Sequence, residues 1–447
     1  MKIKKWAPVV LAGLLLTGCG QTVEDKIADD MEVVIEQDET IDKEEEASPK
    51  AFPESIKVIN PASGQSIDVP VVSDGIADAA VYPITEKEVN TETLKERCNR
   101  LFDRDSVEFK KPYEVCSEKE LKEIKDILKE KDLPDQSQEI TETFYQALHY
   151  EADQEVGVSF DPNEPLVSSE RKEMSMDENF NMVSQLEPIK TARATGLIDG
   201  AAYELRYKER PGKRKFELYS VEPHYPFFSM MASTGDGIPG YDENMCDREQ
   251  ALNTAWDLLF KLGIAEKYDV SREAINVVRI DEKNVLDGYT FFFLPKIENA
   301  FAGLDGVRSV CQVNTAENTT TGETSLDYAE IMVDHQGVVS AEFNDLYEMG
   351  EPLSDTLIST EQLEEEIAKE IERFTYFEDK EFDDLGISVR YMPVRKESGM
   401  VYVPTWSAKI ERDAKSSGYM YSLGMHLFSI NALDGGVIYT TNLAQDL

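Results

Sequence analysis

The segment DREQALNTAWDLLFKLGI, residues 247–264, decides the predicted fold. It reads as an amphipathic helix that runs from Asp247 and stops at Gly263. Its apolar side chains recur at helical spacing and are Ala251, Leu252, Ala255, Trp256, Leu258, Leu259 and Leu262. Strand-like runs follow it, namely INVVRI, GYTFFFLPKI, GVRSVCQVN and LDYAEIMVDHQGVVSAEFND, the last with a turn at 334–337. One helix followed by several strands predicts a helix packed on an antiparallel sheet.

The same order occurs twice more along the chain. An earlier helix, NTETLKERCNRLF, begins at Asn90 or Thr91, and two more helices are expected at 117–131 and 137–155. The hairpin GLIDGAAYELRYKERPGKRKFELYSVEP follows, with RPGK as its turn. A later helix, STEQLEEEIAKEIERF, has Ser359 as N-cap and Gln362 at the capping-box position, and strands follow it to the end of the chain.

These patterns predict an α+β fold of repeated units, each an amphipathic helix packed on an antiparallel sheet, after a disordered acidic tether. The tether is expected because EDKIADDMEVVIEQDETIDKEEEASPK is dominated by acids and has no aromatic residue, so it cannot bury enough apolar surface to fold. The expected domains are a lipoprotein signal peptide (1–18), the tether with possible short strands (19–89), and α+β units at 90–240, 241–356 and 357–447.

The amino terminus has the pattern of an export signal. Lys2, Lys4 and Lys5 precede an apolar run, Trp6–Leu16, that is too short for a transmembrane helix of about 20 residues. A basic start, an apolar middle and a small-residue end are typical of a secretory signal peptide.

The end of this run, Leu16-Thr17-Gly18-Cys19, resembles the bacterial lipobox. The resemblance implies that the chain is cut before Cys19 and that Cys19 carries acyl chains such as palmitate. Two acyl chains give stable anchoring, so the expected location is extracytoplasmic, lipid-anchored at Cys19 to the outer face of the cell membrane. The alternative is an ordinary signal peptide with an incidental cysteine.

The charge balance restricts the partners. The 447 residues include 88 acidic and 46 basic side chains, for a formal net charge of −42. Such a surface repels nucleic acid and anionic lipid headgroups and favours cations or basic partners. A simpler explanation of this charge is solubility at an ion-rich cell exterior.

Four cysteines remain beyond Cys19, and an even number outside the cytoplasm permits two disulfides. Sequence order suggests the pairs Cys98–Cys116 and Cys246–Cys311, although three connectivities exist. Four buried free thiols are the alternative.

No recognisable motif for catalysis or metal binding is found. The four histidines, His149, His224, His335 and His426, lie far apart and outside any H-E-x-x-H pattern, so a structural role is expected for each. The run GDGIPG (235–240) fits G-x-G-x-x-G but does not open a helix, as a dinucleotide site requires. Oxygen ligands at 281–288 and 159–165 have loop spacings that suit weak divalent-ion binding, but neither forms a calcium loop. We therefore predict no catalytic residues, no metal centre and no cofactor.

The carboxyl-terminal run carries a second resemblance. Its motifs are Val403-Pro404-Thr405-Trp406, Phe428-Ser429-Ile430-Asn431-Ala432 and Asp434-Gly435-Gly436-Val437-Ile438. This run resembles secreted modules of the PepSY type and the YycH and YycI extracytoplasmic regulators of Firmicute sensor kinases. The whole chain looks similar to clostridial surface lipoproteins of a domain-of-unknown-function family. The resemblance implies a binding or regulatory role and supplies no active site.

The expected function is therefore that of a membrane-anchored, non-enzymatic lipoprotein that binds an envelope protein or regulates an envelope process. One alternative is a lipoprotein that binds a solute or a wall fragment. A less favoured alternative is a hydrolase of wall polymers. The oligomeric state stays open.

Overall fold

The computed structural model divides the chain into two compact units, Met1–Ser48 and Pro49–Leu447. Every described residue belongs to the second unit. The described residues are 52–59, 64, 66–72, 80–112, 160–176, 182–211, 213–225, 227–232, 243–304, 307, 309–312, 322–372, 385–396, 399–410 and 425–440. The lipobox and the helices expected at 117–131 and 137–155 lie outside them.

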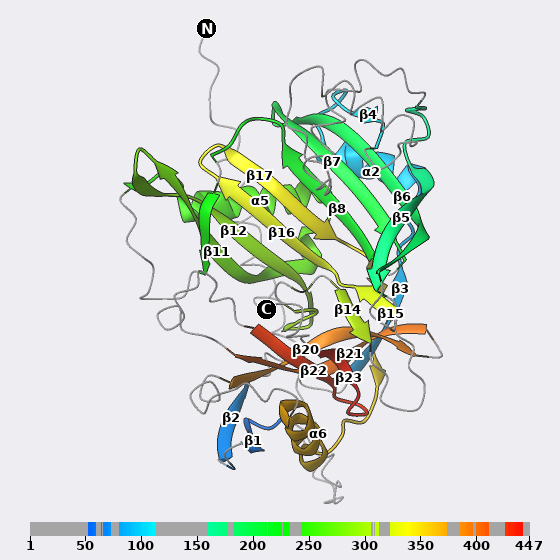
Figure 1. Cartoon of the computed structure of the whole chain (residues 1–447), viewed down its shortest axis with the longest axis vertical. Coiled ribbons are helices and arrows are strands. Elements are labelled where there is room, and N and C mark those ends of the chain that lie inside the picture. Colours follow the sequence, from blue (N-terminus) through cyan, green and yellow to red (C-terminus); the bar gives the residue numbers. More distant parts are fainter. Residues whose placement is uncertain are drawn as a thin grey trace, which may run out of the picture. The chain divides into compact units, whose positions relative to one another are not determined.

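A 12-stranded sheet, here called the large sheet, has the strand order β4-β6-β7-β8-β17-β16-β12-β11-β9 (Figure 1). Strand β5 pairs with β6, and β10 and β13 pair with β12. Every pairing in it is antiparallel except that of β10 with β12. Its strands are β4 (Glu108–Lys110), β5 (Val167–Met176), β6 (Met182–Ile198), β7 (Ala201–Arg210), β8 (Lys213–Ser220), β9 (Phe227–Ala232), β10 (Glu243–Asn244), β11 (Tyr268–Ile280), β12 (Lys283–Ile297), β13 (Ala300–Phe301), β16 (Tyr328–Asp334) and β17 (Gly337–Asn344).

A nine-stranded sheet, here called the small sheet, has the order β1-β2-β20-β21-β22-β23, with β3 joined to β18, β19 and β21. Its strands are β1 (Ser55–Ile59), β2 (Ser66–Val72), β3 (Ala80–Glu86), β18 (Tyr347–Met349), β19 (Leu353–Ser354), β20 (Leu385–Lys396), β21 (Gly399–Ile410), β22 (Met425–Asn431) and β23 (Val437–Thr440). A separate pair consists of β14 (Ser309–Gln312) and β15 (Gly322–Ser325).

The described part of the chain contains three α-helices, α2 (Thr91–Leu101), α5 (Arg248–Leu262) and α6 (Thr360–Glu372), and the short 3-10 helix η3 (Ala265–Lys267). The predicted positions of these helices are confirmed. Of the two candidates Asn90 and Thr91, Asn90 caps α2; Asp247 is the N-cap of α5, which ends at Gly263, whose φ is 74°. Ser359 and Gln362 form the predicted capping box of α6, with reciprocal bonds of 3.1 and 3.2 Å.

Two principal apolar cores stabilise the unit. Helix α5 packs on β12, β16 and β17 of the large sheet and contacts α2, and both helices contribute buried side chains to that core. Helix α6 contacts β1 and β22 of the small sheet (Figure 1). Because each helix covers only a few strands, most of the stabilising burial comes from the sheets themselves.

The prediction of repeated helix-on-sheet units is wrong. The described part of the chain is mostly β, and its two main sheets mix strands from all of the expected units. Strand β8, from the first expected unit, pairs with β17 from the second. Strand β3, from the expected tether, pairs with β21 near the carboxyl end. The apolar alternation predicts which face of a strand is buried, but it does not specify the partner of that strand.

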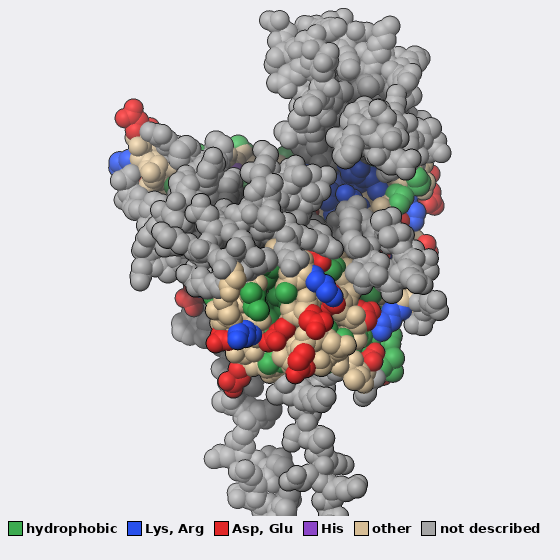
Figure 2. Space-filling model, turned by 60° about the horizontal axis from the view of Figure 1, so that its bottom comes forward, with side chains coloured by type: hydrophobic (Ala, Val, Ile, Leu, Met, Phe, Trp, Pro, Cys, Tyr) green, Lys and Arg blue, Asp and Glu red, His purple; other side chains and the backbone are tan. Residues whose placement is uncertain are grey.

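Among the described residues, no helix has both the length and the apolar character needed to cross a membrane. Figure 2 shows Asp and Glu side chains interspersed with Lys and Arg side chains over one face, with a group of basic side chains together at the upper right.

Candidate metal centre

Three side chains meet where β12 and β16 run side by side in the large sheet. The antiparallel register pairs Tyr289 with Val333 and Thr290 with Met332. Two residues further along, this register places Asp287 opposite His335, in the turn between β16 and β17. Asp334 is the last residue of β16, so strand pairing brings together residues that lie 47 and 48 positions apart.

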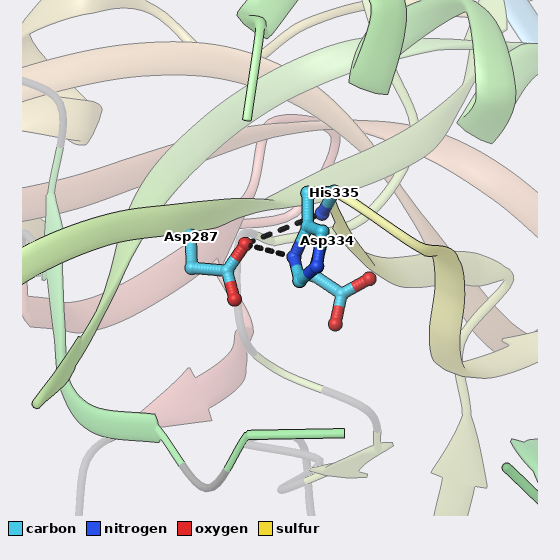
Figure 3. A group of neighbouring side chains, drawn as sticks. All are labelled: Asp287, Asp334 and His335. Atoms are coloured by element: carbon cyan, nitrogen blue, oxygen red, sulfur yellow. Dashed lines mark hydrogen bonds and ion pairs between the residues drawn. The ribbon is translucent and has the colours of Figure 1, made fainter. Parts of the chain in front are cut away.

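Asp287 is fully buried and holds His335 with one of its two carboxylate oxygens. Its Oδ1 atom lies 2.6 Å from Nδ1 of His335 and 3.3 Å from the backbone nitrogen of the same residue (Figure 3). Its other oxygen, Oδ2, is buried and has no hydrogen-bond partner. Because a buried carboxylate oxygen without a partner is costly, Oδ2 is a candidate ligand atom.

Asp334 makes a matching contact with a second histidine. Its Oδ2 atom lies 2.6 Å from Nδ1 of His224, while its Oδ1 atom accepts hydrogen bonds from the backbone nitrogens of Gln336 and Gly337 at 2.8 and 3.1 Å. These two backbone bonds form the turn after β16. The remaining ring nitrogen of His224, Nε2, is buried and has no hydrogen-bond partner.

The close approach of β12 to β16 depends on Gly288, next to Asp287. The φ of Gly288 is 149°, and a Cβ atom there would lie 2.4 Å from the carbonyl oxygen of Val333. Only glycine fits this combination of conformation and contact. Gly288 therefore holds the Asp287 carboxylate against the end of β16.

The cluster concentrates negative charge in a buried place. The side chains of Asp287 and Asp334 are 0% and 1% exposed. Within the described residues, their ion-pair contacts are to His335 and His224, and none is to a lysine or an arginine. Burial, followed by the charges of Asp287, Asp334 and Asp247, raises the pKa of the nearby Cys246 thiol to about 12. Burial of a carboxylate is costly unless the group is paired, hydrogen-bonded or bound to a metal ion.

The donor set fits a divalent transition metal. One ligand atom each from Asp287, Asp334 and His335 lies within 4.8 Å of the others. Zinc bonds to nitrogen and carboxylate oxygen are about 2.1 Å long, which separates tetrahedral ligand atoms by about 3.4 Å, so only small side-chain movements are needed. The His335 side chain is 27% exposed and lies under the ring of Tyr225, with centroids 6.3 Å apart, so solvent reaches the cluster on that side.

The sequence indicated two parts of this cluster without connecting them. Asp287 lies in the run at 281–288, but Asp281 and Glu282 form the β11–β12 turn, and Asp287 acts from within β12 instead of from a loop. His335 and His224 were expected to be isolated, yet both contact carboxylates of one cluster. His426 is buried in β22, 3.4 Å from the hydroxyl oxygen of Ser407. His149 and the run GDGIPG lie outside the described residues.

The second run of oxygen ligands, at 159–165, has a local role where it is described. Asp161 Oδ1 accepts a hydrogen bond of 2.8 Å from the backbone nitrogen of Asn163 and one of 3.0 Å from its side chain. These bonds are those of a turn.

The structure describes only two of the five cysteine side chains about which predictions were made. Cys98 and Cys246 are buried free cysteines, and burial is the main reason that the pKa of each rises to about 12. Cys19, Cys116 and the side chain of Cys311 lie outside the described part of the chain. Lipidation and both disulfide pairings therefore stay predictions.

Comparisons with known proteins identify no family. No protein-family model matches the chain, and no curated protein matches it. Among solved structures, the chain is similar to an uncharacterized protein from Eubacterium rectale ATCC 33656, determined at 1.45 Å resolution. The identity is 14%, the TM-score is 0.39, and the match covers 87% of this chain and 94% of that one. At this TM-score the likeness supports no assignment of function.

Proposed function

We propose that this chain is an envelope lipoprotein that binds a divalent transition-metal ion, best matched by Zn²⁺, through Asp287, Asp334 and His335. The observation that carries the proposal is the buried Oδ2 atom of Asp287, which has no hydrogen-bond partner while the other oxygen holds His335. A metal ion beside this oxygen would satisfy it and neutralise the two carboxylates. Mixed carboxylate and imidazole donors favour zinc and similar ions, whereas calcium needs six to eight oxygens.

His224 has a supporting role in this proposal. Its Nδ1 atom contacts Asp334 at 2.6 Å, and its side chain is 10% exposed. A histidine hydrogen-bonded to a metal-binding carboxylate fixes the orientation of that carboxylate, and loss of such a contact typically weakens metal binding 10- to 100-fold. His224 therefore orients Asp334 for the ion.

The amino-terminal lipid anchor proposed at Cys19 would hold the metal-binding unit at the outer face of the membrane. The bound ion would stabilise the end of β16 and the turn that follows it, on the large sheet. In this proposal the protein binds or regulates an envelope component. The ion keeps the surface formed by this turn folded. Because the chain is strongly acidic, the expected protein partner is a basic one.

The test is zinc titration of the chelator-treated, full mature chain by isothermal titration calorimetry. We expect one ion per chain for the wild type and a loss of at least about 100-fold in affinity for Asp287→Asn, which removes the ligand charge but keeps the shape. The matched control is Asp281→Asn, in the turn at the start of the same strand, where φ is 50° and asparagine is well tolerated.

Two outcomes would contradict the proposal. The first is a wild-type chain that binds no zinc. The second is zinc binding that Asp287→Asn and Asp281→Asn weaken equally, because this would show attraction to acidic side chains in general. Circular dichroism of both variants shows whether they are folded, and a calcium titration provides the comparison for ion type.

A further inference from the structure

The proposed metal centre has fewer protein ligands than the ion binds. Among the described residues, the group of ligand atoms consists of one each from Asp287, Asp334 and His335. Zinc in proteins usually takes four ligands, and a site with three protein ligands leaves the fourth position to water or to an incoming group. The ion would therefore have one coordination position for a donor from another molecule.

The open side of the metal centre is the side of His335. The carboxylates of Asp287 and Asp334 are buried, whereas the imidazole of His335 is partly exposed. The ring of Tyr225 lies over this imidazole at an interplanar angle of 28°, and Tyr225 itself is 45% exposed. A donor from another molecule would therefore approach the ion beside His335 and Tyr225.

The charge of the site favours a neutral donor in the fourth position. The two carboxylates balance the two positive charges of the ion, and a histidine binds a metal as the neutral ring. The side-chain donors that proteins offer to zinc are thiolate, carboxylate and imidazole, of which only imidazole is neutral. A further anion would bring an unbalanced negative charge into a place where two carboxylates are already buried. The site therefore favours a second histidine.

The other described histidines of the chain do not provide this ligand. His224 holds Asp334 through its Nδ1 atom at 2.6 Å, and its ring is not part of the group of ligand atoms. His426 is buried in β22, in the small sheet. Within the described part of the chain, the fourth ligand is therefore left to a partner.

Exposed apolar side chains lie next to the residues of the metal centre. Val221 and Tyr225, which are 52% and 45% exposed, belong to the segment that follows β8. Met245 is 40% exposed, and its backbone nitrogen donates a hydrogen bond of 2.9 Å to the carbonyl oxygen of Leu286, the residue before Asp287. Val221, Tyr225 and Met245 are here called the apolar rim. Because tyrosine is enriched among the residues that dominate protein–protein binding, the apolar rim suits contact with another protein.

We infer that the metal centre binds a histidine from a basic segment of a protein partner, and that the apolar rim is the surface around it. The imidazole of the partner completes the coordination of the ion beside Tyr225. The segment that carries it is basic because this chain has a formal net charge of −42. This inference rests on the proposed metal site and adds the chemistry by which a partner recognises that site.

The test uses two short lysine-rich peptides, one with a central histidine and one with alanine in its place. Fluorescence anisotropy measures the binding of each peptide to the full mature chain, either loaded with one equivalent of zinc or treated with a chelator. We expect the histidine peptide to bind the zinc-loaded chain at least about tenfold more tightly than it binds the chelator-treated chain. Its affinity for the zinc-loaded chain should also exceed that of the alanine peptide by at least about tenfold.

A substitution in the apolar rim tests where the peptide binds. In the zinc-loaded chain, Tyr225→Ala should weaken binding of the histidine peptide about tenfold, because it removes the ring beside the open position. The matched control is Phe260→Ala, which removes another exposed aromatic ring, 64% exposed, near the end of α5. Phe260 lies about 18 Å along the helix from Arg248, where α5 begins near the metal centre, and its loss should change the affinity less than about twofold.

Cobalt reports directly on the ligands of the ion. With Co²⁺ in place of Zn²⁺, the histidine peptide should change the visible absorption of the ion, and the alanine peptide should not. Only a group bound to the ion alters its ligand field, so this result separates coordination from attraction between lysines and an acidic chain.

The outcomes separate this inference from the proposed function. Equal affinities of the two peptides for the zinc-loaded chain, or a cobalt spectrum that the histidine peptide leaves unchanged, would overturn the inference and leave the metal site in place. Equal effects of Tyr225→Ala and Phe260→Ala would overturn the apolar rim as the docking surface. A chain that binds no zinc would overturn the proposed function and this inference with it.

Discussion

At the scale of single residues, buried carboxylates differ in the groups that they contact. The carboxylates of Asp287 and Asp334 contact imidazoles, whereas Glu204 contacts two guanidinium groups. Glu204 lies 3.0 Å from Nε of Arg193 and 2.6 Å from Nε of Arg206, and its side chain is 10% exposed. Guanidinium groups stay charged at any ordinary pH, so Glu204 belongs to a permanent ion network.

Glu204 leads to a prediction about pH. Burial acts to raise its pKa, but Arg206 and Arg193 outweigh burial and hold the pKa below its ordinary value. A carboxyl with a lower pKa in the folded state stabilises that state above its unfolded pKa of about 4.3, and this contribution is lost as pH falls through the folded pKa. We expect Glu204→Gln to lower the free energy of unfolding by about 3 kcal/mol at pH 7, with the difference shrinking below about pH 4.

The measurement is urea denaturation of wild type and variant between pH 3 and pH 8. Glu96→Gln is the control, because Glu96 pairs with Arg100 on the helix surface where both side chains are more than half exposed. Its effect should stay below about 0.5 kcal/mol at every pH. A Glu204→Gln effect that is the same at pH 3 and pH 7 would show that the ion network does not account for it.

At the scale of elements, the proposed metal centre depends on how closely two strands approach. Strand β12 carries Asp287 and Gly288, and β16 ends at Asp334. The turn residues Asp334–Gly337 were predicted from the sequence, because polar turn residues there separate two alternating apolar segments. The pairing of β16 with β12, about 40 residues earlier, was not predicted. The alternation of apolar and polar residues along a strand does not depend on which strand pairs with it.

Gly288 provides the test of this close approach. In Gly288→Ala the new methyl group would meet the carbonyl oxygen of Val333 at 2.4 Å, at a φ that alanine rarely adopts. We expect a loss of at least about 2 kcal/mol in the free energy of unfolding, and weaker zinc binding because Asp287 moves with the strand. Denaturation and zinc titration measure the two effects.

Gly386→Ala is the matched control, since it also lies in a strand, β20, and a Cβ atom there meets nothing within 4 Å. Its stability should change by less than about 1 kcal/mol in either direction. Equal effects of the two substitutions would mean that loss of glycine flexibility, and not the contact with β16, determines the result.

At the scale of the whole molecule, the small sheet joins the two ends of the described chain. Strand β2 pairs in parallel with β20, and β3 pairs with β21. Strand β3 also pairs with β18, which follows directly after the last strand of the large sheet. Units that each fold alone would keep such pairings within themselves, and this chain does not.

This topology predicts the result of truncation. A chain ending at residue 356, the boundary expected from the sequence, loses β20, which pairs with β2, and β21, which pairs with β3, and exposes the apolar surface that these strands cover. We expect it to lack a cooperative thermal transition, because the apolar area that remains buried no longer offsets the ordering entropy. A chain ending at residue 440 keeps every described strand and should unfold cooperatively, like the full chain. Calorimetry distinguishes the two, and a cooperative transition in the shorter chain would contradict the interlocked topology.

The sequence by itself determined the local features of this protein. It located the three described helices with their caps, the RPGK hairpin turn between β7 and β8, and the Asp334–Gly337 turn, because helix periodicity, capping and turn chemistry depend on residues within a few positions of one another. These are interactions that a single stretch of chain specifies without a partner.

Only the tertiary structure decided how the strands are shared between the two main sheets, and with that the candidate sites. Asp287 meets His335 because strands from distant parts of the chain share a sheet. Strand partners are selected by the total burial and hydrogen bonding of the whole sheet. That selection is a property of the assembled molecule, and no local pattern in the sequence contains it.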